Sequence, residues 1–215
     1  MATPLYFNYA TLTTSGNSWH PWEQGLRENG VAKLTECGGE LYGVWNPLFG
    51  LASNQVVVMT SWSVPDGVIQ HVTETFMAVE GIVSVADHLV VPTSRPTTNA
   101  PPYKPGLYVH RWFLLESRHV DEAVALSATA WETFEHTFEV EIIGFFRTVE
   151  PQTELAELML LTWYPTLAAW EKSRHAELTP EARTRFIRRR ELSQVTRAIA
   201  TSLEGAGSYL ATRIS

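Results

Sequence analysis

The sequence predicts an α+β protein made of two similar halves, each with the β-α-β-β-α-β order of a ferredoxin-like unit. Two observations lead to this fold class. Residues 40–64 and 141–165 match at a constant offset of 101, which aligns Gly43 with Gly144 and Trp62 with Trp163. Residues 5–8 then match residues 107–110 at an offset of 102. An internal repeat of this length indicates two copies of one structural unit.

In the second half, the elements follow one another clearly. Residues 107–115 are rich in aromatic and aliphatic side chains, which favours a strand. Ser117 is expected to cap a helix whose first turn carries Asp121 and Glu122. The apolar face of that helix continues through Val120, Val124, Ala128 and Trp131. Two strands follow over 140–149 and 156–164, joined by a turn at 150–153.

The C-terminal region predicts a helix from Leu167 that restarts at Thr179 and Pro180, with Thr as the N-cap and Pro in the first turn. Its apolar face is expected to continue at spacings of three or four through Leu192, Val195, Ile199 and Leu203. The glycines at 205 and 207 would end this helix. Residues 208–214 are then expected to form the last strand, aligned with residues 87–90 of the first half.

The first half is the weaker copy. A helix expected within 21–34 carries Gly25 and Gly30, each of which costs about 1 kcal/mol relative to alanine. A second, short helix is expected over 66–79. The predicted organisation is a first unit over 1–94, a proline-rich linker over 95–106 and a second unit over 107–215. Because a ferredoxin-like sheet has helices on one face only, we expect the two sheets to cover each other within one chain, and any homo-oligomer to use outer surfaces.

The composition and charge of the chain narrow the classes of partner that it is expected to bind. The net charge is −7 and the pI is near 5.5, which argues against nucleic acid as a partner. Five arginines between 183 and 190 are interpreted as a solvated helix face or as a site for an anionic partner. The sequence shows neither an 18-residue apolar run nor a secretory signal, and Cys37 is its only cysteine. These features predict a cytoplasmic protein that does not interact with membranes.

The strings GVW (43–45), LFG (48–50) and NQVVVMTSW (54–62) resemble the NIPSNAP family. The second half repeats them as GFF (144–146) and LMLLTWY (158–164), and its strand YVHRWFL (108–114) carries Arg111 at the place of a characteristic arginine. In the first half Tyr9 stands at that place. The resemblance implies the dimeric α+β barrel superfamily, in which two ferredoxin-like sheets close face to face. It therefore predicts one intramolecular barrel, with helices outside.

What the resemblance implies about function is broader. The superfamily includes cofactor-independent monooxygenases, isomerases, polyketide cyclases, chlorite dismutases and heme-degrading monooxygenases, which share a deep apolar cavity beside the sheet. The expected partner is a small apolar or aromatic molecule, which suits a chain with 8 Trp, 9 Phe and 7 Tyr. No cofactor is predicted under this hypothesis. The heme alternative depends on Asn8, Trp62 and His71, which stand at places similar to those of the Asn, Trp and His used by the heme-degrading members of the superfamily.

Three polar side chains are candidate catalytic groups. Asn8 and His110 are expected at equivalent positions of the two opening strands, where a buried polar group needs a partner or a ligand. His88 is expected to share a strand face with Val90 and could act as a general base or a heme ligand. The alternative for each is a hydrogen-bonded structural residue.

Candidate substrate-binding residues are Tyr9, Trp62, Arg111 and Trp163. Arg111 could bind a carboxylate with both guanidinium arms or form an ion pair with Glu141 or Glu157. The two tryptophans are either cavity walls or packing residues. A third class of function stays open: a non-catalytic interaction protein in which the first half only completes the barrel.

Overall fold

The computed structural model describes residues 5–149, 154–175 and 180–205, and in it eight antiparallel strands close into one barrel. The first half supplies β1 (Tyr6–Thr14), β2 (Glu40–Phe49), β3 (Gln55–Trp62) and β4 (Ile82–Arg95); the second supplies β5 (Leu107–Glu116), β6 (Glu141–Thr148), β7 (Leu155–Tyr164) and β8 (Ser193–Leu203). The order around the barrel is β1-β3-β2-β8-β5-β7-β6-β4. Both halves therefore have the same strand order, and the pairs β2–β8 and β4–β6 join them. The predicted α+β barrel closed within one chain is confirmed.

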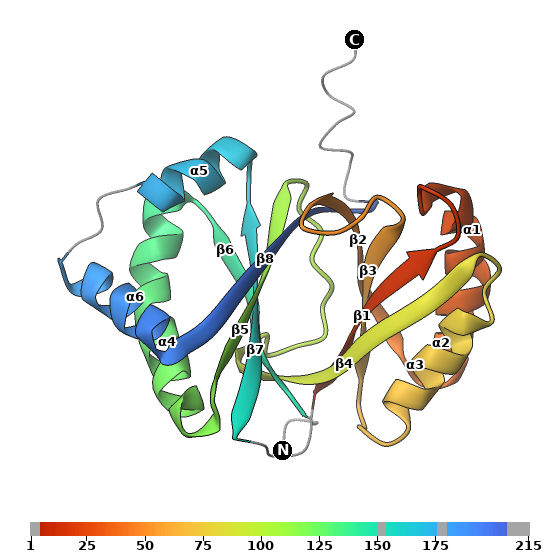
Figure 1. Ribbon diagram of the computed structural model, residues 1–215, viewed down its shortest axis with the longest axis horizontal. Coiled ribbons are helices and arrows are strands. Elements are labelled where there is room, and N and C mark those ends of the chain that lie inside the picture. The colour runs from red at the N-terminus through yellow and green to blue at the C-terminus, as the bar shows by residue number, and fades with distance from the viewer. Residues whose placement is uncertain (1–4, 150–153, 176–179, 206–215) are drawn as a thin grey trace, which may run out of the picture.

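The helices lie on the outside of the barrel, those of each half against their own sheet (Figure 1). The second half carries α4 (Val120–Phe138), α5 (Leu167–His175) and α6 (Pro180–Leu192). The first half carries α1 (Glu23–Gly25), α2 (Ala32–Glu36) and α3 (Val68–Met77), with a π-helical stretch, Leu26–Val31, between α1 and α2. In the part of the chain that is described, no helix has the length and apolar character needed to cross a membrane.

Successive side chains of each strand point to opposite faces of the sheet, so the buried residues form one layer inside the barrel and others under the helices. One face of β1 and β5 points into the barrel, where Phe7, Tyr9, Tyr108 and Trp112 belong to one apolar cluster. The other face packs against helices. Ala10 and Leu12 contact the first-half helices, and Phe113 and Leu115 belong to the cluster that includes residues of α4.

A glycine and an aromatic ring two residues later mark the same structural device in each half. The register of β2 with β3 shifts just before Gly43, and that of β6 with β7 shifts just before Gly144. A Cβ atom at Gly43 would collide with the ring of Trp45, and one at Gly144 with the ring of Phe146. Only glycine lets the ring lie over the bulged backbone, which explains why these positions match between the halves.

The strand register corrects two of the predicted equivalences. Glu40 pairs with Ser61 and Glu141 pairs with Trp163, so the counterpart of Trp163 is Ser61. Trp62 corresponds instead to Tyr164, since both stand one residue later. The prediction that Trp62 and Trp163 are equivalent is therefore wrong: Trp62 packs on the helix side and Trp163 against the barrel cluster.

The same register also corrects the predicted correspondence between residues of β1 and residues of β5. Trp62 pairs with Tyr6, and Tyr164 pairs with Leu107. It follows that Tyr9 corresponds to His110, and Ala10 corresponds to Arg111. The predicted equivalences of Asn8 with His110 and of Tyr9 with Arg111 are wrong by one residue, which moves each side chain to the opposite face of its strand.

The last strand lies earlier in the chain than predicted. The helix α6 ends at Leu192, and residues 193–203 form β8, which pairs with β5 along its length. Val195, Ile199 and Leu203 are spaced by four, and that spacing places residues on one face of a strand as well as of a helix. The predicted strand over 208–214 lies outside the described residues.

The other second-half elements agree with prediction, except for the cap of α4. The strands β5, β6 and β7 and the helices α4 and α5 are confirmed. Ser117 does not cap α4, because the helix is preceded by a 3-10 turn over Ser117–His119 whose N-cap residue is Glu116. The turn at 150–153 and the N-cap at Thr179 lie outside the described residues.

Candidate functional site

A cavity of about 500 Å³ lies between the outer face of the second-half sheet and the helices α4, α5 and α6. The apolar part of its lining is formed by Phe113 and Leu160 from the sheet and by Trp131, Phe134 and Ile187 from the helices. This volume is in the range of small-molecule sites in proteins. The predicted cavity beside the sheet is therefore present in the second half.

Arginines give this cavity its charge. Arg111 from β5, Arg174 from α5 and Arg189 from α6 all line it. Burial lowers the pKa of Arg111, and the charge of Arg174 lowers it further. Burial likewise lowers the pKa of Arg189 to about 10, with smaller contributions from the charges of Arg111 and Arg174. With Arg190 of α6, which also lines the cavity, four positive groups share one partly enclosed space.

The acidic side chains nearby have other partners. Glu122 accepts two hydrogen bonds from Arg188, Glu135 pairs with Arg95, and Glu141 pairs with Lys104. Within the described ranges, no carboxylate forms an ion pair with Arg111 or Arg174. The predicted ion pair of Arg111 with Glu141 or Glu157 is therefore wrong.

This arrangement predicts that Arg111 lowers the stability of the ligand-free protein. A buried charge without a counter-ion costs free energy, and replacing buried charged groups with apolar ones of similar size is often stabilising. We expect Arg111→Met to raise the free energy of unfolding by about 1–3 kcal/mol. Urea unfolding at neutral pH measures this. A loss of stability in Arg111→Met would contradict the unpaired state of the charge.

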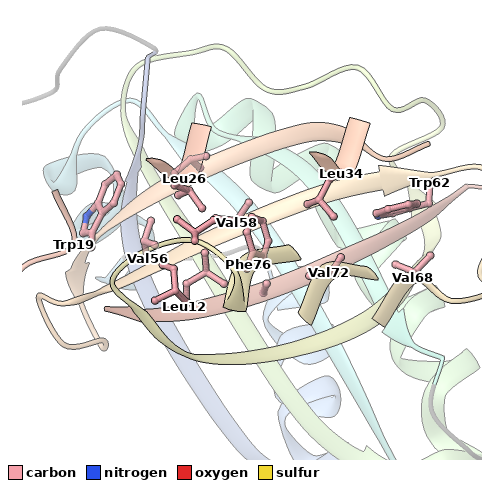
Figure 2. Packing of buried hydrophobic residues seen from close by; sticks show 14 residues of the cluster. Leu12, Trp19, Leu26, Leu34, Val56, Val58, Trp62, Val68, Val72 and Phe76 are labelled. Atoms are coloured by element: carbon pink, nitrogen blue, oxygen red, sulfur yellow. The ribbon is translucent and has the colours of Figure 1, made fainter. Parts of the chain in front are cut away.

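The corresponding region of the first half is filled with side chains. Trp62, at the position of Tyr164, lies near Leu34 and Val68 in an apolar cluster that also includes Val72 and Phe76 (Figure 2). Its indole nitrogen donates to Thr60 Oγ1 at 2.8 Å. In the second half, the matching Tyr164 and Thr162 both line the cavity. At the position of Arg111, the first half has Ala10, which lies in the same apolar cluster.

The candidate catalytic histidines lie in the barrel and do not line this cavity. The His110 ring contacts Tyr9 and Trp45, with ring centroids 5.5 and 5.2 Å apart. His88 lies 5.1 Å from Trp112 and shares the barrel face with Val90, as predicted. Tyr9 therefore belongs to the aromatic interior of the barrel as well.

Hydrogen bonds define the tautomer of His110. The hydroxyl of Thr201 donates to the carbonyl oxygen of Tyr108, so it accepts from Nε2–H of His110 at 3.0 Å. Nδ1 is then the unprotonated nitrogen, buried and without a hydrogen-bond partner among the described residues. Burial lowers the pKa of His110 to about 3, so the ring is neutral at physiological pH.

The three residues of the heme alternative do not form one site. Asn8 is buried and donates to Asp87 at 2.7 Å, Trp62 fills the first-half core, and His71 is exposed on α3. The second-half cavity has no histidine, cysteine or methionine among its lining residues. Burial also raises the pKa of Tyr164, which keeps that phenol protonated. The residues present therefore do not fit a heme with an axial protein ligand.

Of the predicted substrate-binding residues, only Arg111 lies at the cavity. Trp163 donates its indole N–H to the carbonyl of Pro105 and lies under Lys104 Nζ, 4.9 Å from the ring centroid. Arg174 and Arg189 were not among the residues predicted to bind substrate, although Arg189 belongs to the arginine-rich stretch interpreted as a possible site for an anionic partner. The arginine-rich stretch was the available signal, but its helical register could not be fixed: Arg188 is exposed, whereas its neighbour Arg189 turns inward.

Comparisons with known proteins agree on the fold. The chain matches an anthrone oxidase-like protein with a TM-score of 0.63, 13% identity and coverage of 98% of this chain and 97% of the other. It matches chlorite dismutase from Candidatus Nitrospira defluvii with a TM-score of 0.63, 9% identity and coverage of 96% and 93%. It also matches a heme-binding protein from Thermus thermophilus with a TM-score of 0.52 and 11% identity, and the match covers 97% of this chain and 94% of the other. No family model and no curated protein matches the chain, so the NIPSNAP resemblance stays a prediction.

Proposed function

We propose that this protein binds a small organic molecule with an apolar or aromatic body in the cavity between the second-half sheet and α4, α5 and α6. The observation that carries the proposal is the contrast between the halves. The same place is filled by Trp62 and its neighbours in the first half and is open in the second. A cavity kept open in one of two similar units, lined by apolar side chains together with polar groups that can orient a molecule, is typical of a ligand site.

The proposed enzyme class is an oxygenase, isomerase or cyclase acting on the bound molecule. Solved structures with the same fold include an anthrone oxidase-like protein and a chlorite dismutase, which supports this direction at the level of fold only. The polar groups available at the cavity are the hydroxyls of Thr162, Tyr164, Ser173 and Thr196 besides the arginines. These could orient a ligand and stabilise negative charge that develops on its oxygen atoms.

A neutral fluorescent probe tests whether the cavity binds ligands. N-phenyl-1-naphthylamine carries no charge, so its binding reports the apolar walls alone. We expect it to bind the unmodified protein with increased fluorescence. Thr196→Trp, which places an indole over the cavity from β8, should weaken binding at least about tenfold by occupying the space.

The neighbouring residue gives the matched control. Val195 lies on the same strand, does not line the cavity and is 56% exposed. Val195→Trp adds the same side chain on the opposite face and should leave probe binding unchanged. Equal effects of the two substitutions, or no binding by the unmodified protein, would refute the proposal.

Hemin titration addresses the heme alternative directly. Because the cavity offers no histidine, cysteine or methionine, we expect hemin to give no Soret shift characteristic of axial ligation. Such a shift that survives in His71→Ala but disappears in Thr196→Trp would place heme in the second-half cavity and overturn this expectation.

A further inference from the structure

Three arginines from separate elements converge on the cavity of the second half, and this determines what kind of molecule it suits. We infer that the ligand carries a carboxylate bound by Arg111, Arg174 and Arg189, so that the substrate class is an amphipathic organic acid with an aromatic or aliphatic body. This inference rests on the proposed function, since it assumes that the cavity is the ligand site.

Positive charge is concentrated in this cavity. Like charges repel, and burial adds the cost of removing each guanidinium from water. Both effects act on Arg111 and Arg189, whose pKa values are lowered by burial first and by the neighbouring arginines second. Arg111 and Arg174 have no ion-pair partner within the described residues. An anion in the cavity would relieve both costs at once.

Contacts with β5 and α4 hold the guanidinium of Arg189 in place. Its Nη1 donates to Ser127 Oγ at 3.1 Å, and that hydroxyl donates to the carbonyl of Ala123 at 2.7 Å. Its guanidinium also lies over the Phe113 ring, 5.2 Å from the centroid. These contacts position the planar group. A guanidinium fixed in this way is suited to binding a carboxylate through paired N–H donors.

The cavity also has an apolar lining that the rest of the ligand could contact. It includes the side chains of Trp131, Phe134, Ile142 and Leu160, which carry no charge. A hydrated inorganic anion would leave these walls in contact with water, whereas an apolar body would cover them. The arrangement therefore favours a molecule with one acidic end and one apolar end.

The net charge of the chain and the equivalent region of the first half both support an anionic ligand. The protein carries a net charge of −7, so a group of arginines facing one cavity is a local exception that would attract anions. The first half, whose equivalent region is filled, has Ala10 in place of Arg111. The charge and the open space therefore occur together in the same half.

Matched pairs of probes separate the carboxylate from the apolar body. We would measure displacement of N-phenyl-1-naphthylamine by 2-naphthoate and 2-naphthamide, and by decanoate and decanamide. In each pair the two molecules have nearly the same shape, and only the acid is charged at neutral pH. We expect at least one acid to bind about tenfold or more tightly than its amide.

Substitutions then identify the groups responsible. Arg111→Met and Arg189→Met keep an unbranched side chain of similar length and should reduce the preference for the acid to about threefold or less. Arg188→Met is the matched control, because Arg188 adjoins Arg189 on α6 but is exposed and pairs with Glu122. It should retain the full preference. Thermal unfolding confirms that each variant is folded before binding is compared.

The outcomes distinguish this inference from the proposed function. If the neutral fluorophore binds but the acids displace it no better than the amides, the carboxylate inference fails and the proposed function stands. A preference for acids that survives both Arg111→Met and Arg189→Met overturns the inference as well. If inorganic phosphate displaces the fluorophore as well as 2-naphthoate does, the apolar body is not recognised. If the fluorophore itself does not bind, the proposed function fails.

Discussion

Trp62→Ala is expected to lower the free energy of unfolding by about 3–5 kcal/mol, the range for removing a large aromatic side chain from a core. Trp62 is 4% exposed and packs among the side chains that join the first-half sheet to its helices. A Cβ atom at Gly39 would lie 2.6 Å from its ring, which shows how closely the backbone approaches the indole. The substitution would leave a void and deprive Thr60 Oγ1 of its indole donor.

Trp163→Ala is the matched comparison, with an expected cost of about 1–2 kcal/mol. Trp163 is only partly buried, and its indole contacts are with Pro105 and Lys104 near the start of β5. Urea unfolding of both variants measures the difference. Trp62→Tyr, which introduces the residue found at the equivalent position 164, should cost less than Trp62→Ala. Equal losses at 62 and 163 would contradict the strand register described above.

The fold was predictable because its strongest signals are local. The glycine followed by an aromatic ring at 43–45 and 144–146 reflects the same bulge in both halves, so matching letters correspond to matching geometry. The position of β8 was not predictable in this way. Val195, Ile199 and Leu203 are spaced by four, and this pattern alone cannot distinguish the face of a helix from the face of a strand.

The site was predicted only in part, for a related reason. Arg111 was identified because it stands at the place of a characteristic arginine in the strand that resembles the NIPSNAP family. Arg174 and Arg189 stand among other charged residues on helices, and whether such a residue faces solvent or the sheet depends on tertiary packing. An offset error of one residue also assigned Asn8 and His110 to the same face, because side chains alternate along a strand.

Acid is expected to destabilise this protein through His110. The side chain is 0% exposed, and burial lowers its pKa from 6.5 to about 3. Between these two values the unfolded chain binds a proton that the folded protein does not, so stability falls as the pH is lowered from about 6.5 to about 3. At pH 4 this one group would lower the free energy of unfolding by about 3 kcal/mol relative to pH 7.

His110→Gln tests this expectation, because the amide can still donate to Thr201 but does not titrate. Its free energy of unfolding, measured by urea denaturation from pH 7 to pH 4, should fall less steeply than that of the unmodified protein. His136→Gln, an exposed position on α4, should keep the original slope. If His110→Gln and the unmodified protein lose stability equally over this range, the neutral, buried state of His110 is not what makes the barrel acid-sensitive. The aromatic interior would then tolerate the imidazolium, and His110 would be available to titrate.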